Sequence, residues 1–182
     1  MKKTPFPLIP QANDNFYLQK YGGAVQIQDV KLIDLPHINN EEGDFSEVLR
    51  LTEEGTLERF PHFKLRQINR TELFPGSIKA WHFHFRQDEI WYTGPNNHIV
   101  VGLWDVRKDS PTSGQSTKII LGNGNRNMLY IPKGVAHGSI NTSLRPLNLF
   151  YFVDQQFNIE NPDEQRIHWD TLGADFWKPE RD

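Results

Sequence analysis

The sequence predicts an all-β protein in which two layers of strands form one barrel or sandwich, with few and short helices. Three observations support this fold class. The 182 residues are the length of one ordinary domain. After residue 23, short runs rich in β-branched and aromatic residues recur between Gly, Pro, Asn and Asp. Only residues 47–53 and 163–172 have the character of short helical segments.

The chain divides into two unequal parts. Residues 1–22 carry three prolines and no clear hydrophobic period, so we expect an extended amino-terminal arm. Residues 23–182 are expected to form a single β domain, because strand-like runs and turn residues alternate throughout them.

The clearest predicted strand is residues 98–107. Ile99, Val101 and Leu103 fall on one face and Trp104 falls on the other, so the strand is expected to be covered on both sides. We expect further strands, in chain order, at residues 63–69, 77–83, 89–93, 117–121, 127–131 and 147–153. Residues 94–97 and 123–125 have the Gly, Pro and Asn composition of the turns between them.

The composition excludes several classes of function. The 20 basic and 23 acidic side chains are interspersed and give a net charge of −3, so no basic surface for nucleic acid is expected. There is no cysteine, which excludes disulfides, thiolate metal sites and cysteine nucleophiles. No apolar run approaches the ~20 residues of a membrane span, and no signal peptide is recognisable. We therefore expect a cytoplasmic protein with no membrane partner.

Two short segments carry the strongest chemical signal. The first reads GSIKAWHFHFRQDE and contains His82, His84 and Glu89; the second reads PKGVAHGSIN and contains His137. His82 and His84 are two residues apart, so on a strand they face the same side. Glu89 is expected at the start of the next strand, from which it can reach back to both histidines.

These segments resemble the two motifs of the cupin superfamily, G-x5-H-x-H-x4-E and P-x-G-x2-H-x3-N. The resemblance implies a double-stranded β-helix, or jelly-roll barrel, with the histidines lining its interior. In metal-binding cupins the motifs surround one divalent ion, so the implied ligands are His82, His84, Glu89 and His137. Nitrogen and oxygen donors without sulfur suit Zn, Fe, Ni or Mn. The alternative is that these histidines only fill and hydrogen-bond the barrel interior.

A second resemblance extends from about residue 25 to residue 177. Its clearest piece is Asp105-Val106-Arg107 followed by SPTSG, which matches the pattern D-x-R-x2-S-P-T-x-G. Other pieces follow in matching order at residues 40–47, 67–69, 79–83, 131–138, 150–151 and 167–170. The ordered set resembles the dTDP-4-dehydrorhamnose 3,5-epimerase family, itself a group with the cupin fold.

This family removes and returns a proton at carbons beside the 4-keto group of a nucleotide-linked sugar. The resemblance therefore implies a carbohydrate epimerase or isomerase whose partner is a small sugar or sugar-nucleotide substrate. Carried over by position, His82 is the base and Tyr151 the acid. The implied substrate-binding residues are Glu47, Gln67, Asn69, Lys79 and His137, with Lys79 in place of a phosphate-binding arginine. The resemblance also implies a homodimer, which would cover exposed strand edges.

Three positions depart from the family pattern. Glu89 stands where the family has a lysine beside the reacting oxygen, and Glu42 replaces the arginine of an early motif, near the expected diphosphate. The carboxyl-terminal S-x-K-D segment, whose aspartate partners the basic histidine, has no counterpart.

The departures leave three functions open. In the first, which leads, the chain is a sugar epimerase that acts by proton removal and return; a further hypothesis is that a metal takes over the electrostatic role of the lysine. If His82 binds that metal, Tyr151 or a metal-bound hydroxide accepts the proton instead. In the second, it is a metal-dependent cupin isomerase, lyase or oxygenase. In the third, it is a sugar-binding cupin without catalysis.

Overall fold

The computed structural model of the chain describes residues 6–18 and 26–179, and strands dominate it. Helical structure in these ranges is confined to α1 (Pro10–Asn15) and a 3₁₀ turn at Ala174–Trp177. Helix α1 lies inside the segment expected to be extended, and begins at a proline, whose fixed φ suits a first helical turn. The division into an arm and one domain stays a prediction. No helix of the described ranges is long and apolar enough to cross a membrane.

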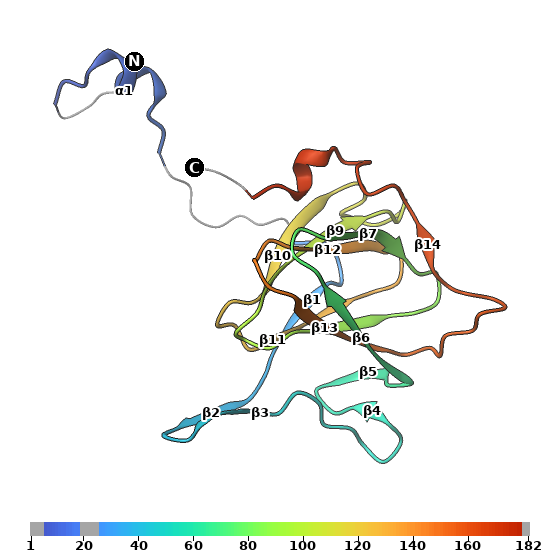
Figure 1. Ribbon diagram of the computed structural model, residues 1–182. Helices are drawn as coiled ribbons and strands as arrows, with labels where there is room; N and C mark the ends of the chain where they lie inside the picture. Colours follow the sequence, from blue (N-terminus) through green and yellow to red (C-terminus); the bar gives the residue numbers. More distant parts are fainter. Residues whose placement is uncertain (1–5, 19–25, 180–182) are drawn as a thin grey trace.

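Ten strands form two five-stranded antiparallel sheets that face each other (Figure 1). The first sheet has the order β1 (Lys31–Asp34), β11 (Asn127–Ile131), β8 (Glu89–Tyr92), β13 (Leu147–Val153) and β6 (Gln67–Leu73). The second has the order β10 (Ser116–Gly122), β9 (His98–Asp105), β12 (Val135–Asn141), β7 (Ile78–Phe83) and β14 (Gln165–Arg166). Two hairpins lie outside the sheets, β2 (His37–Asn40) with β3 (Gly43–Ser46) and β4 (Thr56–Leu57) with β5 (Phe60–Lys64). The predicted all-β jelly-roll barrel is confirmed.

Apolar residues are buried in three clusters, one between the sheets and one on the outer face of each. Strand β9 shows why, because Ile99, Val101 and Leu103 are buried between the sheets while Trp104 packs in the outer cluster. On that outer face Gly102 leaves no room for a side chain, since an added Cβ would lie 2.6 Å from Trp177. The carboxyl-terminal segment therefore packs directly on the backbone of the second sheet.

The predicted strands at residues 77–83, 89–93, 117–121, 127–131 and 147–153 are confirmed as β7, β8, β10, β11 and β13. The strand predicted at residues 98–107 is confirmed as β9, which ends two residues earlier. Residues 63–69 were predicted as one strand, but β5 ends at Lys64 and β6 begins at Gln67. Strand β12 and the strands before residue 60 were not predicted.

Both predicted helical segments are wrong. Residues 47–53 contain no helix, and residues 163–172 form β14 and turns. The physical reason is packing: Val48 and Leu49 are drawn onto the outer cluster of the first sheet. Ile167 and Leu172 pack in the cluster of the second sheet, and such tertiary contacts override local helix propensity.

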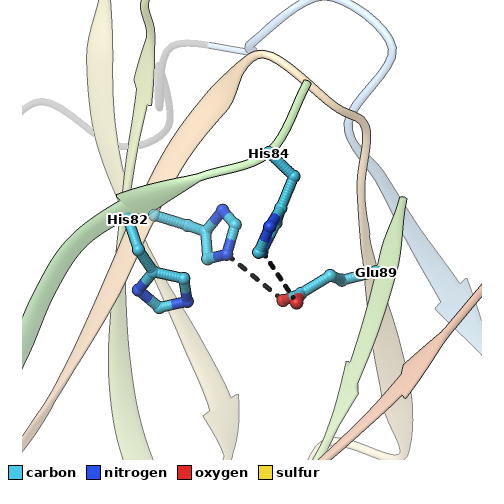
Figure 2. Close-up of side chains that lie close together, drawn as sticks. His82, His84 and Glu89 are labelled. Carbon is cyan, nitrogen blue, oxygen red and sulfur yellow. Dashed lines mark ion pairs between the residues drawn. The ribbon is translucent and has the colours of Figure 1, made fainter. Parts of the chain in front are cut away.

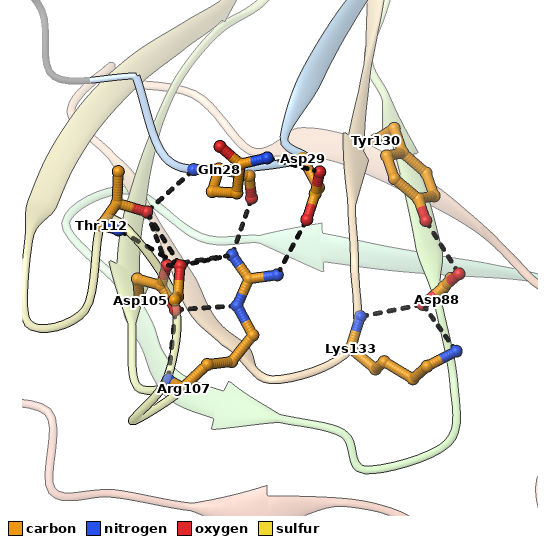
Figure 3. Close-up of polar contacts among 9 residues, drawn as sticks. Gln28, Asp29, Asp88, Asp105, Arg107, Thr112, Tyr130 and Lys133 are labelled. Atoms are coloured by element: carbon orange, nitrogen blue, oxygen red, sulfur yellow. Dashed lines mark hydrogen bonds and ion pairs between the residues drawn. The ribbon is translucent and has the colours of Figure 1, made fainter.

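A buried carboxylate fastens the start of the domain to the barrel (Figure 3). Asp105 is fully buried and accepts hydrogen bonds from Arg107 Nε at 2.8 Å, Ser110 Oγ at 2.6 Å and Thr112 Oγ1 at 2.6 Å. Arg107 and Thr112 in turn hold the carbonyl and amide of Gln28. Burial alone would raise the pKa of Asp105, but the bonds from Arg107, Ser110 and Thr112 hold it far below its usual value.

We expect Asp105→Asn to lower the free energy of unfolding by about 3 kcal/mol at pH 7, because Arg107 loses its partner in a buried network. A depressed pKa stabilises the fold above the pKa of the unfolded chain, so the difference from wild type should shrink as the pH falls below about 4. Urea unfolding of both proteins at several pH values measures this. The exposed neighbour variant Asp109→Asn is the control, and equal losses in both variants would contradict the assignment.

Candidate active site

A polar cavity of about 320 Å³ lies between the two sheets, a volume in the range of small-molecule sites. Strands β6, β8 and β13 of the first sheet and β7 and β12 of the second contribute to its lining, together with the segment that follows β13. Of the residues proposed from the sequence, it is lined by Gln67, Asn69, Lys79, His82, His84, Glu89 and Tyr151.

Three histidines and one glutamate lie close together beside this cavity (Figure 2). His82 is near the end of β7 and pairs in register with His137 of β12, and their rings are 4.1 Å apart. His84 follows β7, and Glu89 begins β8 on the opposite sheet. One donor atom from each of the four residues lies within 4.8 Å of the others. The cluster drawn from the two sequence segments is therefore assembled in space.

Backbone carbonyls fix the ring orientation of His84 and His137. Nδ1 of His84 contacts the carbonyl oxygen of Asp163, and Nδ1 of His137 lies 2.9 Å from that of Val135. A carbonyl oxygen only accepts, so Nδ1 carries the hydrogen and a neutral ring has its lone pair on Nε2. These Nε2 atoms lie 3.0 and 3.2 Å from the carboxylate of Glu89. Each contact is therefore attractive only with an added proton or a metal cation between the atoms.

The surroundings of Glu89, His84 and His82 shift the pKa values of these three groups in different directions. Burial alone would raise the pKa of Glu89, but hydrogen bonds from His137 and His84 hold it well below its usual value. Burial lowers the pKa of His84, and the contacts with Glu89 outweigh this and raise it overall. Burial also holds the pKa of His82 well below its usual value, with a smaller contribution from His137. His82 is thus neutral near pH 7 and Glu89 is ionised.

Two further side chains bind the carboxylate of Glu89, and neither was proposed from the sequence. Gln87 Nε2 donates to Oε1 at 2.8 Å, and Trp91 Nε1 donates to Oε2 at 2.6 Å. Both lie two residues from Glu89, the spacing of one face of a strand, which is the signal that could have identified them. Glu89, 4% exposed, therefore accepts two hydrogen bonds and has two histidine Nε2 atoms within 3.2 Å of its carboxylate.

The backbone on each side of the cluster is held by other aspartates. Asp88, next to Glu89, accepts hydrogen bonds from the hydroxyl of Tyr130 at 2.8 Å and the amide of Lys133 at 2.9 Å (Figure 3). Asp163 accepts bonds from the backbone amides of residues 85–87 at 2.7 to 3.0 Å, while its own carbonyl holds His84. Two turns that are distant in sequence thereby fix the positions of His84 and Glu89.

Tyr151 enters the cavity from β13, on the sheet opposite His82. The ring of Trp91 lies near both, with its centre 6.0 Å from that of His82 and 6.1 Å from that of Tyr151. Burial raises the pKa of Tyr151, and the charge of Glu89 raises it further, so the hydroxyl keeps its proton. Asn69 is paired in register with Tyr151 and accepts a hydrogen bond from Gln67 at 2.7 Å.

Two residues proposed for substrate binding do not reach the cavity. Glu47 is not among its lining residues, and its carboxylate pairs with Arg50. His137 is 1% exposed and is not a lining residue either, so its contact with the cavity runs through Glu89. Both roles remain predictions. The lining residues missed by the sequence include Thr71, Arg86, Arg166 and the carboxamides of residues 155–161.

A jelly-roll barrel whose cavity joins a neutral histidine, a buried carboxylate and a protonated tyrosine has the groups that proton transfer at carbon requires. Comparison with known proteins defines the class further. Residues 24–180 match the family model described as dTDP-4-dehydrorhamnose 3,5-epimerase. The chain therefore belongs to the dTDP-4-dehydrorhamnose 3,5-epimerase family, and it is an enzyme of the carbohydrate epimerase and isomerase class.

Individual relatives support this assignment. The spore coat polysaccharide biosynthesis protein SpsL of Bacillus subtilis is 38% identical over 152 residues, which are 82% of this chain and 96% of SpsL. A Haloferax volcanii protein, named as a probable low-salt glycan biosynthesis epimerase, Agl13, is 30% identical over 79% of this chain and 89% of its own length. A crystal structure of the Legionella pneumophila dTDP-6-deoxy-D-glucose-3,5-epimerase, in complex with dTDP-4-keto-L-rhamnose, has a TM-score of 0.68 and 26% identity. That match covers 85% of this chain and 81% of the Legionella chain.

Proposed function

We propose that this enzyme inverts a carbon beside the keto group of a nucleotide-linked sugar, by removing a proton with His82 and returning one with Tyr151. The observation that carries the proposal is the placement of these two residues. They line one cavity from opposite sheets, and the indole of Trp91 lies near both rings in the wall of that cavity. A sugar ring in the cavity would present one face to His82, which can accept a proton, and the other face to Tyr151, which can donate one.

In the proposed reaction the neutral ring of His82 takes the proton of the carbon, and the electron pair of that bond moves onto the carbonyl oxygen. Tyr151 then gives its proton to the other face of the same carbon, and the carbonyl reforms with the configuration inverted. Solvent returns a proton to Tyr151 and removes one from His82. The low pKa of His82 and the high pKa of Tyr151 support these starting states.

We propose a dTDP-linked keto sugar as substrate and a step in surface-polysaccharide synthesis as its use. The Legionella relative holds dTDP-4-keto-L-rhamnose, and SpsL is named for spore coat polysaccharide biosynthesis. Gln67 and Asn69 would bind the sugar or the base, and Lys79, which reaches across to Thr71 at 2.5 Å, would bind phosphate. The expected cytoplasmic location remains part of this proposal, and fractionation of the source cells would test it.

A homodimer remains part of the proposal as well. Ile38 and Phe45 lie opposite each other in the β2–β3 hairpin and are 63% and 64% exposed. The hairpin projects away from the two sheets (Figure 1), so this apolar pair is available to a second copy.

A single divalent metal, Zn, Fe, Ni or Mn, is the second candidate for the role of the missing lysine. The specific observation in its favour is the pair of Nε2 lone pairs directed at the carboxylate of Glu89. The residues fit such an ion, because three imidazoles and one carboxylate can offer donor atoms within 4.8 Å of one another. His82, His84, Glu89 and His137 would hold it. When bound, it would supply a positive charge near the reacting oxygen.

We expect Tyr151→Phe to lower epimerisation by about 100-fold or more, the usual loss when a general acid is removed. Because His82 is intact, the variant should still exchange the substrate carbon hydrogen with solvent deuterium. NMR of a dTDP-4-keto sugar in deuterium oxide follows both processes at once. Tyr92→Phe, on the same sheet but outside the cavity lining, is the control. If Tyr151→Phe loses deuterium exchange as well as inversion, Tyr151 is not the acid.

If the metal is present, elemental analysis of the untagged protein gives about one equivalent per chain, and His84→Ala loses it. The four-residue geometry is the reason, since removing one imidazole opens the ligand set. A metal held by His82 would take the lone pair that removes the proton, so the two candidates exclude each other at this residue. No metal in either protein, after incubation with each of the four ions, excludes the metal and leaves His82 free to act as the base.

For the dimer, we expect light scattering at micromolar concentration to give twice the 21.2 kDa chain mass. Phe45→Asp should halve that value, because a buried charge opposes association at an apolar contact. Phe74→Asp, at a comparably exposed residue outside the hairpin, is the control. A wild-type mass of one chain would contradict the dimer.

A further inference from the structure

The cavity has its own set of cations, which differs from the set that the sequence comparison suggests. Among the residues that the structure describes, Lys79, Arg86 and Arg166 are the Lys and Arg side chains lining the cavity. Glu42, at the position of the arginine in the early motif, lies in the turn between β2 and β3 and is not a lining residue. A phosphate-binding arginine lost from that segment would therefore have to be replaced from elsewhere in the chain.

Arg166 has a position that Arg86 does not share. It lies in β14, directly opposite His82 of β7 in the strand register. Residues directly opposite each other in an antiparallel pair project from the same face, so both side chains are directed to the cavity side of the sheet. The side chain of Arg166 is 59% exposed, which places it at the mouth of the cavity.

The electrostatics agree with this location. After the larger effects of burial and neighbouring groups, the charge of Arg166 lowers the pKa of His82 and opposes the rise in the pKa of Tyr151. Arg166 also lines the same cavity as His82 and Tyr151. A group attached to the reacting sugar and projecting from the cavity mouth would pass beside it.

We propose that Arg166 binds the diphosphate of the substrate, and so replaces on β14 the arginine that is missing from the early segment. This inference rests on the proposed nucleotide-linked substrate. The planar guanidinium can donate two parallel N–H bonds to phosphate oxygens, which the ammonium of Lys79 cannot do. The two cations reach the mouth from neighbouring strands, Lys79 from β7 and Arg166 from β14.

Glu164 is the competitor for this role of Arg166. Its carboxylate contacts the guanidinium, and it is two residues away on the same segment. An exposed ion pair of this kind is weak and is screened by solvent, so a diphosphate can displace the carboxylate. The arrangement predicts opposite effects for the two residues, because Arg166 attracts the ligand while Glu164 competes with it.

The test is titration calorimetry of the full chain with dTDP and, separately, with inorganic pyrophosphate. Arg166→Ala should weaken the binding of both by about tenfold or more, since bonds to charged groups are lost. Glu164→Gln should tighten both by about two- to fivefold, because the competitor is neutralised. In turnover, Arg166→Ala should raise KM and leave kcat within about twofold.

Arg70→Ala is the matched control. Arg70 is 53% exposed and pairs with Glu72 two residues away, but it lies outside the cavity lining. The affinity of the Arg70→Ala variant for dTDP and for pyrophosphate should equal that of wild type. Circular dichroism melting of each variant separates a folding defect from a binding defect.

Three outcomes would overturn the assignment of Arg166. Equal affinity of Arg166→Ala and wild type for pyrophosphate would exclude the contact between Arg166 and the diphosphate, and would leave the proposed nucleotide-linked substrate in place. A fall in kcat at unchanged KM would assign Arg166 to the reacting atoms instead. A wild-type protein that exchanges deuterium into a free keto sugar, yet binds neither dTDP nor pyrophosphate, would overturn the nucleotide-linked substrate together with this inference.

Discussion

The buried carboxylate of Glu89 is the constraint on which the arrangement of the cavity depends. A charge with 4% exposure is costly unless it is hydrogen-bonded and paired with cations. Gln87 and Trp91 supply the hydrogen bonds, and His84 and His137 supply the pairing once a proton or a metal lies between their Nε2 atoms and the carboxylate. Two of the partners, His84 and His137, belong to segments of the second sheet, while Glu89 and Trp91 belong to the first. The carboxylate therefore joins the two layers at the point where the cavity forms, and it fixes the distance between them.

The position of Glu89 also explains why His82 differs from the other two histidines in its contacts and in its ability to accept a proton. The imidazoles of His84 and His137 lie with Nε2 3.0 and 3.2 Å from the carboxylate of Glu89 and with Nδ1 against backbone carbonyls. His82 has no such carboxylate contact and its buried Nδ1 has no hydrogen-bond partner, so burial dominates and the ring stays neutral. A neutral histidine beside a cluster of bound ones is free to accept a proton.

The departures from the family pattern are related through charge. The chain has a glutamate where a lysine is expected and a second glutamate where an early arginine is expected, which removes two cations and adds two anions. The first anion is neutralised locally by histidines, or by a metal that they and Glu89 would hold. Our assignment of Arg166 accounts for the second, because this cation lines the cavity opposite His82 and would bind the diphosphate of the proposed substrate. The two changes then leave the electrostatic requirements of a sugar-nucleotide enzyme intact.

The sequence by itself determined the fold class, most strands and the cluster of His82, His84, Glu89 and His137, because strand periodicity and motif spacing are local properties. It misassigned residues 47–53 and 163–172 as helical, since their apolar side chains are held by sheets that are distant along the chain. Only the tertiary structure decided that Asp163 orients His84, that Trp91 binds Glu89 and that Arg166 faces His82. It also showed that Glu47 is not a lining residue of the cavity, although its motif had suggested substrate binding. Contacts of this kind depend on which strands become neighbours and on how turns cross between the two sheets, and no local pattern encodes that choice.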